Sequence, residues 1–132
     1  MNIPSDRRYA KSHEWVQVVG KSNEGRHVRV GISDVAQDAL GDVVYVDLPD
    51  VDAVFSATDQ MVEVESTKSV ADVFAPVSGT VVAVNEELDD SPKLVNSDPY
   101  GTGWFVELTL NEPSELDDLL SADQYLAQVT EG

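Results

Sequence analysis

The middle of the chain alternates apolar and polar residues with a period of two, which is typical of half-buried β-strands. Seven stretches follow this pattern, at residues 14–19, 26–31, 42–48, 61–66, 70–75, 80–85 and 104–110. Turn-forming residues separate them, as in Leu48-Pro49-Asp50 and Pro76-Val77-Ser78-Gly79. Many short strands with turn signals between them predict an all-β domain of sandwich or barrel type.

Three short helices are expected beside the strands. They span residues 35–40, 113–119 and 121 to about 129. In the first, Asp34 is the predicted N-cap, Gln37 completes a capping box and Gly41 ends the helix. The second begins with Pro113, which suits a first helical turn, and the third begins with a Ser-x-x-Gln capping-box pattern.

A faint internal repeat relates residues 41–46 to residues 79–84, which share a glycine and three valines. Each copy is followed by an acidic, turn-rich stretch and then by another alternating segment, at 61–65 and 104–108. The repeat predicts two similar β units packed face to face with pseudo-twofold symmetry. The second copy contains an extra stretch, residues 93–103.

Length and composition predict one domain. The chain has 132 residues, of which 42% are hydrophobic, enough for a single core. We expect residues 1–132 to form one unit, with a core at about 9–110 and a helical C-terminal segment at about 112–130. No apolar stretch approaches the roughly 18 residues that span a bilayer, and the start lacks the apolar segment of a secretory signal. A cytoplasmic location is expected, or the mitochondrial matrix for a mature eukaryotic chain.

The chain is strongly acidic, with a formal net charge of −17. Such a surface repels phosphates, which disfavours binding to nucleic acids and anionic membranes. The charge is consistent with steering toward basic partners and equally with solubility alone. Because there are no cysteines, disulfides, thiolate metal sites and thiol nucleophiles are excluded, and any redox-active sulfur must come from a cofactor.

Motifs for catalysis are absent. His13 and His27 have no metal-binding spacing, so no metal site is expected, and no serine lies in a Gly-x-Ser-x-Gly elbow. The sequence Gly101-Thr102-Gly103 lacks the third glycine of a dinucleotide loop and leads into a predicted strand. The chain is therefore not expected to be an enzyme on its own.

Lys68 lies between two alternating runs, at 62–65 and 70–76. The valines of the first run can face the core while its glutamates face water. Small polar residues fill the interval, so the simplest structure is a β-hairpin with Lys68 near its tip. A lysine there extends a flexible stem to a modifying enzyme, although an exposed lysine can equally do no more than solvate the surface.

Several segments together resemble the H protein family of the glycine cleavage system. They are KSHEWV at 11–16, VGISD at 30–34, AQ at 36–37, LGDVVYVDLP at 40–49, VESTKS at 64–69, APVSG at 75–79, LVNSDPYG at 94–101, GW at 103–104 and PSEL at 113–116. The resemblance extends in the family's order from about Tyr9 to Tyr125.

This resemblance implies a lipoyl group joined by an amide to Lys68, and the barrel-sandwich fold of lipoyl and biotinyl domains, with two small antiparallel sheets. It implies a monomeric carrier that shuttles between three enzymes. A pyridoxal-phosphate glycine decarboxylase (P-protein) loads an aminomethyl group onto the arm. A tetrahydrofolate-dependent aminomethyltransferase (T-protein) removes it, and a dihydrolipoyl dehydrogenase (L-protein) reoxidises the dithiol. A lipoyl or octanoyl transferase, or a lipoate ligase, would attach the cofactor.

The resemblance also suggests roles for residues around the arm. Recognition of the attachment site falls to Glu63, Glu65, Ser66, Thr67, Ser69 and Asp72. The candidates for the arm cavity are Ser12, Glu14, Asn96 and Tyr100, with Ser12 and Glu14 contacting the loaded ammonium. For each of these residues a purely structural role is the alternative, as is a structural turn at residues 96–103.

Three positions depart from the family pattern. Asp52 and Thr58 lie near places where the family often has glycine, and Val35 replaces an aromatic or imidazole ring. Asp tolerates a left-handed backbone better than a β-branched Thr does.

Two other carrier functions remain as alternatives. One is a carrier used mainly in lipoate relay or biosynthesis, which would use the same lysine. The other is a biotin carrier, which the flanking Thr67 and Ser69 disfavour because biotin domains usually have Met on both sides of the lysine.

Overall fold

The computed structural model describes residues 2–22 and 25–131. The strands are β1 (Arg8–Tyr9), β2 (Glu14–Ser22), β3 (Gly25–Ile32), β4 (Val43–Asp47), β5 (Val54–Phe55), β6 (Gln60–Ser66), β7 (Val70–Phe74), β8 (Gly79–Val84) and β9 (Val106–Leu110). The helices are α1 (Asp34–Leu40), α2 (Glu87–Asp90), α3 (Leu94–Ser97), the 3₁₀ helix η1 (Pro113–Asp118) and α4 (Ala122–Glu131). The seven predicted strands are all present, with ends that differ by no more than three residues.

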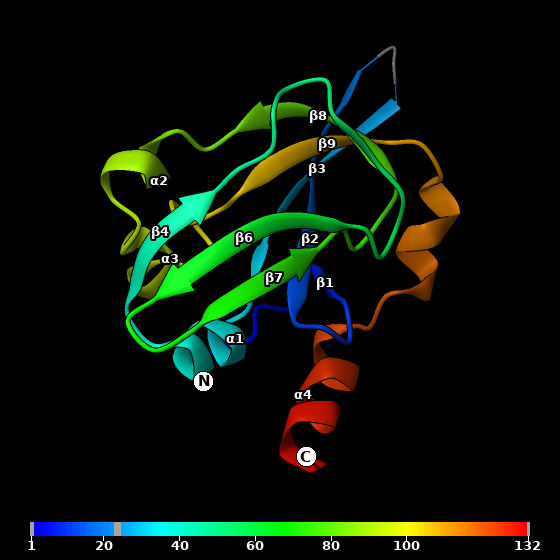
Figure 1. Cartoon of the computed structure of the whole chain (residues 1–132). Coiled ribbons are helices and arrows are strands. Elements are labelled where there is room, and N and C mark those ends of the chain that lie inside the picture. Colours follow the sequence, from blue (N-terminus) through cyan, green and yellow to red (C-terminus); the bar gives the residue numbers. More distant parts are fainter. Residues whose placement is uncertain (1, 23–24, 132) are drawn as a thin grey trace.

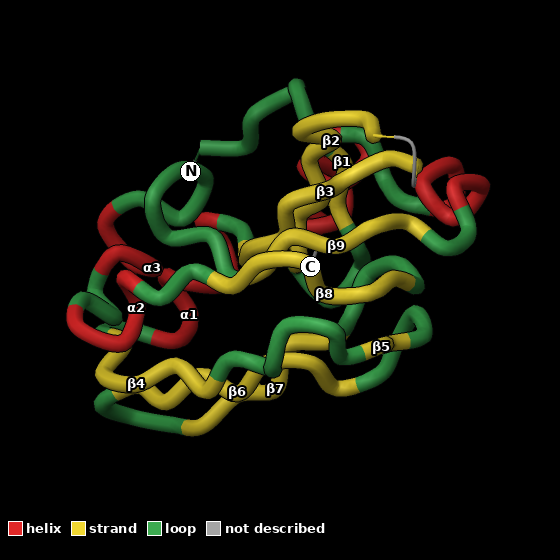
Figure 2. The backbone as a smooth tube through the Cα atoms, turned by 90° about the horizontal axis from the view of Figure 1, so that it is seen from above, coloured by secondary structure: helices red, strands yellow, loops and turns green. Residues whose placement is uncertain are grey.

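Two antiparallel sheets pack face to face, as Figure 2 shows in a view along the layers. The larger sheet has the strand order β1-β2-β3-β9-β8-β5, and the smaller has the order β4-β6-β7. The prediction of two small antiparallel sheets is therefore confirmed, although the sheets are unequal in size. Helices α1, α2 and α3 gather at one end of the sandwich. Helix α4 packs beside β1 and extends away from the sheets (Figure 1).

The sequence repeat has a structural counterpart. In the first copy β4 pairs with β6, and in the second β8 pairs with β9. Both ladders contain an irregularity at the equivalent place, between Val43 and Tyr45 in β4 and between Val81 and Ala83 in β8. A β-bulge increases local twist and bends the strand, so the matching positions indicate that the two copies curve around the core in the same way.

Valines fill the space between the sheets. Val62 and Val64 of β6 are buried, while Glu63 and Glu65 alternate with them and are partly exposed. The facing sheet contributes Val28, Val30 and Val81, all fully buried. Burial of each such side chain is worth about 1.5–3 kcal/mol, so the period-two pattern in the sequence accounts for the main core.

A second, smaller core forms where the N-terminal and C-terminal segments meet. Tyr9, Trp15 and Tyr125 are fully buried there, and the rings of Tyr9 and Tyr125 stack at 4.7 Å. The indole nitrogen of Trp15 donates to the carbonyl of Pro99 at 3.0 Å. Helix α4 therefore packs onto the rest of the protein through Tyr125, with Ala122 and Val129 beside it.

The helix predictions need correction in three places. The N-cap of α1 is Ser33, whose hydroxyl accepts from the Ala36 amide at 3.2 Å, and not Asp34. Asp34 instead lies in the first turn, where its carboxylate accepts from the side chain of Gln37. The segment from Pro113 is a 3₁₀ helix that ends at Asp118, and the one-turn helices α2 and α3 were not predicted.

Two other helix predictions are confirmed. Gly41 ends α1, and its amide donates to the carbonyl of Gln37 at 3.1 Å. At the start of α4, Ser121 and Gln124 form the predicted reciprocal capping box, with bonds of 2.9 and 3.2 Å.

Candidate functional site

Lys68 lies at the tip of the β6–β7 hairpin, as predicted. The last paired residues are Glu65 and Val70, and Ser66 organises the tip between them. Its hydroxyl oxygen accepts from the amides of Ser69 at 3.1 Å and Lys68 at 3.3 Å, and its amide donates to the carbonyl of Ser69 at 2.8 Å. Small polar residues therefore fix the backbone of the tip without covering Lys68.

The side chain of Lys68 is exposed, and among the described residues its ammonium forms no ion pair or hydrogen bond. Its stem lies against Gly41, the residue that ends α1. A methyl group added to Gly41 would be 2.8 Å from Cε of Lys68. Gly41 also has a φ of 78°, a left-handed conformation that glycine adopts without steric cost. Glycine is thus favoured here by the backbone of the helix end, and it also leaves room for the lysine stem.

Asn96 fixes the segment beneath the hairpin tip. Its side-chain amide donates to the carbonyl of Gly41 at 2.8 Å, and its side-chain oxygen accepts from the amide of Val43 at 2.8 Å. Between them, the carbonyl of Asp42 accepts from the amide of Thr67 at 3.0 Å. Asn96, in α3, therefore supports the hairpin tip through the backbone of residues 41–43.

Three carboxylates line up across the outer face of the smaller sheet. Asp47 of β4 pairs with Glu63 of β6, which pairs with Asp72 of β7. Like charges directly opposite one another are unfavourable, and none of the ion pairs between described residues involves these three. Glu63 and Asp72 were predicted from the sequence; Asp47 was not, although it continues the alternation of β4.

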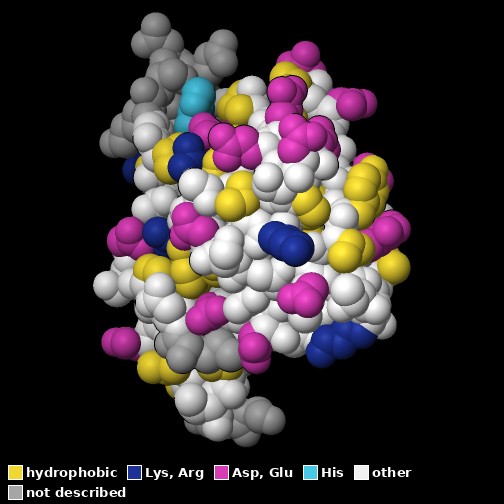
Figure 3. All heavy atoms as spheres, turned by 90° about the vertical axis from the view of Figure 1, so that its left-hand side faces the viewer, with side chains coloured by type: hydrophobic (Ala, Val, Ile, Leu, Met, Phe, Trp, Pro, Cys, Tyr) yellow, Lys and Arg dark blue, Asp and Glu magenta, His cyan; other side chains and the backbone are white. Residues whose placement is uncertain are grey.

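Acidic side chains dominate other surfaces as well. Figure 3 views the side that carries α2, α3 and the edge of β4, where acidic side chains are spread widely and basic ones are isolated. The acidic row on the smaller sheet is therefore one part of a strongly negative surface, and it lies on the strands that lead to Lys68.

Ser12 and Glu14 hydrogen-bond to each other at the start of β2, where the Ser12 hydroxyl donates to Oε1 of Glu14. The Glu14 side chain is only 2% exposed, and Oε2 accepts from the amide of Phe74 at 3.3 Å. Burial raises the pKa of Glu14 to about 7, although the two hydrogen bonds oppose the shift. Glu14 thus joins the larger sheet to the exposed edge of β7, with an acid that titrates near neutral pH.

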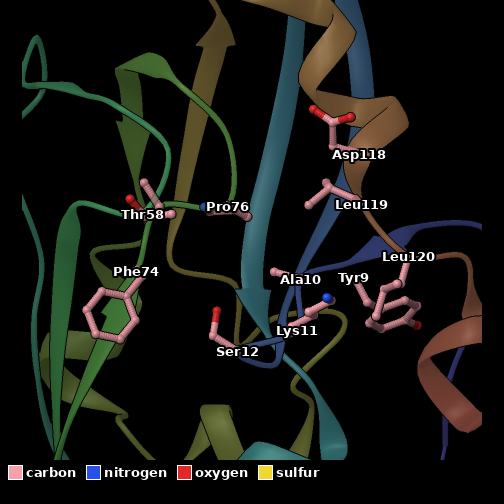
Figure 4. Close-up of a pocket in the computed structure, with 11 residues that line it drawn as sticks. Tyr9, Ala10, Lys11, Ser12, Thr58, Phe74, Pro76, Asp118, Leu119 and Leu120 are labelled. Atoms are coloured by element: carbon pink, nitrogen blue, oxygen red, sulfur yellow. The ribbon is translucent and has the colours of Figure 1, made fainter. Parts of the chain in front are cut away.

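A cavity of about 480 Å³ opens beside Ser12. Its walls come from the β1–β2 turn, the end of β7 and the connection from η1 to α4 (Figure 4). The lining residues are Tyr9, Ala10, Lys11, Ser12, Thr58, Phe74, Ala75, Pro76, Asp118, Leu119 and Leu120. Since β7 has five residues, the cavity lies on the order of 15–20 Å from Lys68 along the strand.

The structure separates the four residues predicted for an arm cavity. Ser12 lines the cavity and Glu14 lies beneath Ser12, whereas Asn96 and Tyr100 are not among the lining residues. The Tyr100 hydroxyl accepts from the amide of Asp34 at 2.9 Å and donates to the carbonyl of Asn2 at 2.7 Å. Tyr100 therefore connects the N-terminal segment to the start of α1.

Within residues 2–22 and 25–131, positive φ angles occur at three non-glycine residues. Asp52 and Thr58 both have φ of 78°, and His13 has φ of 81°. The first two confirm that these positions need the backbone that glycine provides, as their place in the sequence suggested. The strained backbone at His13 was not predicted, and it lies between Ser12 and Glu14.

The fold and the lysine together define a class of protein. Two antiparallel sheets built from an internal repeat, with an exposed lysine at a hairpin tip, are typical of domains that carry a cofactor on a swinging lysine arm. Comparison with known proteins identifies the member of this class. Residues 7–132 match the family described as glycine cleavage H-protein, and the chain belongs to that family.

Individual relatives agree over nearly the whole chain. The glycine cleavage system H protein of Geobacillus kaustophilus is 49% identical, with all of both chains covered. That of Micrococcus luteus is 52% identical, with 98% of each chain covered. A crystal structure of a glycine cleavage system H protein from Mycobacterium marinum superposes with a TM-score of 0.86 at 42% identity, covering 97% of this chain and 99% of that one.

Family membership supports a role as lipoyl carrier in the glycine cleavage system. Two further findings concern the described part of the chain. It contains no cluster of three or more side chains that would hold a metal ion. None of its helices is long and apolar enough to cross a membrane.

Proposed function

We propose that Lys68 carries a lipoyl group, joined to its ε-amine as an amide, and that the chain acts as a carrier without catalytic activity of its own. The proposal is carried by Lys68 itself, which is exposed, has no partner for its ammonium among the described residues, and lies at a hairpin tip held by hydrogen bonds. The tip holds the backbone in place while the ammonium end of the side chain stays exposed, which suits attachment by a separate enzyme. Amide formation removes the lysine charge, so the arm can lie on apolar surface at low cost.

The lipoyl group would supply the redox-active disulfide, which this chain cannot supply itself because it has no cysteine. What the protein contributes is the tether. A tethered group has a high effective concentration at any partner site that the arm can reach. The proposed partners are glycine decarboxylase, the tetrahydrofolate-dependent aminomethyltransferase and dihydrolipoyl dehydrogenase, together with a lipoyl or octanoyl transferase or a lipoate ligase.

The acidic row is proposed as part of the recognition surface. Glu63, Asp72 and the neighbouring Glu65 lie on strands that lead directly into the tip. An enzyme that modifies Lys68 must approach this end of the hairpin, where a basic surface would relieve the repulsion between the carboxylates. Ser66, Thr67 and Ser69 would contribute by holding the tip in one shape.

The Ser12–Glu14 pair is proposed to receive the amine of the loaded arm. The adjacent cavity has a mostly apolar wall and would exclude water from a group that water hydrolyses. If the Ser12 hydroxyl turns away, Oε1 of Glu14 becomes available to a cation. A cation beside a carboxylate favours its charged form, so binding would lower the pKa of Glu14 from about 7. This buried carboxylate favours carriage of an amine over a role in lipoate relay alone.

The attachment site is tested by intact-mass measurement after production in a host that lipoylates proteins. The wild-type chain should gain one lipoyl increment, and Lys68→Arg should gain none while keeping the thermal stability of the wild type. Lys93→Arg, at another exposed lysine, is the matched control and should keep the increment. An increment that survives Lys68→Arg overturns the proposal. The lipoylated wild type should also support glycine–bicarbonate exchange by the decarboxylase.

A further inference from the structure

Tyr125 is the residue through which α4 enters the domain. Its side chain is fully buried, stacks on Tyr9 with an interplanar angle of 7°, and meets the ring of His13 edge-on at 5.6 Å. The stacking explains why an aromatic residue is needed. It does not explain why the ring carries a hydroxyl group in a buried place, where a polar atom is costly unless it is hydrogen-bonded.

That hydroxyl joins two segments that are far apart in the sequence. It lies 2.6 Å from Nδ1 of His13 and 2.7 Å from Oγ of Ser33. Oγ of Ser33 already accepts from the Ala36 amide, so its own proton can be donated to Tyr125, whose proton then goes to His13. Burial lowers the pKa of His13, which favours the neutral ring that accepts this bond.

On one side, the contact holds the segment that carries Ser12 and Glu14. His13 has the left-handed φ of 81°, and its amide donates to the carbonyl of Ala10 at 3.0 Å. Such a conformation persists only where the surroundings impose it. The next residue is Glu14, whose carboxylate reaches the amide of Phe74. The position of His13 therefore sets where this carboxylate lies.

On the other side, the contact holds the start of α1, the helix that leads to Gly41 beside the lysine stem. Ser33 is fully buried and caps α1, and its amide donates to the carbonyl of His13 at 2.9 Å. Seven residues later α1 ends, and Gly41 follows against the stem of Lys68. The same tyrosine hydroxyl is thus bonded both to the segment that carries Ser12 and Glu14 and to the residue that caps α1.

We infer that Tyr125 is a positioning residue of the carrier site, which fixes the Ser12–Glu14 segment and α1 relative to each other. The geometric part of this inference stands without any cofactor. Its consequence for the arm rests on the proposed function. Tyr125→Phe removes the hydroxyl and keeps the ring. Ser121→Ala removes the N-cap of the same helix without touching that hydroxyl, and it serves as the control for loss of helix stability.

The test is amide hydrogen exchange on the unlipoylated chain. Two amides report the two ends of the contact: that of Phe74, which donates to Glu14, and that of Ala36, which donates to Ser33. In Tyr125→Phe both should exchange about tenfold faster relative to core amides such as that of Val64, because a buried polar group loses its partner. In Ser121→Ala they should follow the core amides. Equal behaviour of the two variants overturns the inference.

A second measurement connects the contact to the arm. In the lipoylated, aminomethyl-loaded chain, Tyr125→Phe should release the aminomethyl group several-fold faster than Ser121→Ala. Added to Glu14→Gln, it should cause little further increase, because it acts through the same carboxylate. If Glu14→Gln itself leaves release unchanged, the proposed function of the Ser12–Glu14 pair fails, whereas the exchange result on the unlipoylated chain still decides the role of Tyr125.

Discussion

The two copies of the repeat begin with equivalent glycines that meet very different neighbours. A methyl group on Gly41 would approach Cε of Lys68 at 2.8 Å, the far end of a flexible side chain. The same group on Gly79 would collide with the carbonyl oxygen of Thr109, which is backbone of the paired strand. One glycine therefore makes room for a movable lysine, and the other makes room for the sheet itself.

The difference extends to the segment that comes after each copy. After β6 the chain turns through the Lys68 tip into β7, which is an edge strand. After β9 it enters η1, where Glu115 closes the start of the second copy by accepting from the amide and hydroxyl of Ser78 at 2.7 and 3.0 Å. We call the second copy closed, because Glu115 binds its start, and the first copy open, because it continues into the edge strand β7. The open copy carries Lys68, the proposed attachment site.

Replacing each glycine with alanine tests this contrast most directly. Gly79→Ala should lower the free energy of unfolding by about 3 kcal/mol, because overpacking against backbone cannot be relieved by a rotamer change. Gly41→Ala should cost about 1–2 kcal/mol, mainly from the positive φ, since the lysine stem can move aside. Denaturant unfolding measures both effects.

The glycine variants should also differ in function. Per folded molecule, Gly41→Ala should slow lipoylation of Lys68 and Gly79→Ala should not. Equal losses of stability with equal rates of lipoylation would contradict the contrast between an open and a closed copy.

Glu14 accepts a hydrogen bond from the Phe74 amide at the free edge of β7, a strand with no equivalent in the second copy. Burial raises its pKa from 4.5 to about 7, so the folded state binds this proton more tightly than the unfolded state does. The resulting stability is complete below pH 4.5 and is lost as the pH rises through 7. Wild-type protein at pH 8 therefore contains a buried charge that Glu14→Gln lacks.

The stability of Glu14→Gln relative to wild type should accordingly rise by about 2–3 kcal/mol between pH 4.5 and pH 8. Urea unfolding of both proteins across this range measures the difference, in which the titration of all other groups cancels. A difference that does not change with pH would show that Glu14 does not titrate in this window, and β7 would then have no pH-sensitive edge.

Sequence patterns predicted the parts of this molecule that depend on neighbours in the chain. Alternation gave the strands, and small polar residues gave the hairpin tip with Lys68. The same alternation would leave Glu14 as exposed as Glu63, but the amide that binds Glu14 lies 60 residues away in β7. No local pattern contains such a contact.

The other features that the sequence did not predict also depend on contacts between distant segments or are too short to show a pattern. Strands β1 and β5 have two residues each, too few to show a period. The role of Asn96 depends on α3 packing beside α1, and the burial of Tyr125 depends on α4 docking across the chain. Family resemblance located Ser12 and Asn96, but only the structure shows that one lines a cavity and the other supports a backbone.

The two copies also differ in the linker between their paired strands, which joins β4 to β6 in the first copy and β8 to β9 in the second. The second linker, residues 85–105, contains α2 and α3, whereas the first, residues 48–59, contains the short strand β5 between four-residue turns. In one turn the amide of Ala53 donates to the carbonyl of Asp50 at 3.2 Å, and in another the amide of Asp59 donates to the carbonyl of Ser56 at 3.0 Å. The third residues of these turns, Asp52 and Thr58, have positive φ. This geometry is that of a type II turn, which favours glycine at the third position.

Thr58→Gly should therefore stabilise the protein by about 0.5–1 kcal/mol, because relief of the β-branched residue in the left-handed region exceeds the added entropy of the unfolded chain. Asp52→Gly should change stability less, since Asp accepts this backbone more readily. Thermal unfolding of the two variants compares them. Thr58 also lines the cavity beside Ser12. If Thr58→Gly is more stable than wild type but loses the aminomethyl group faster when loaded, the strained threonine contributes to the arm cavity of the open copy rather than to the stability of the fold.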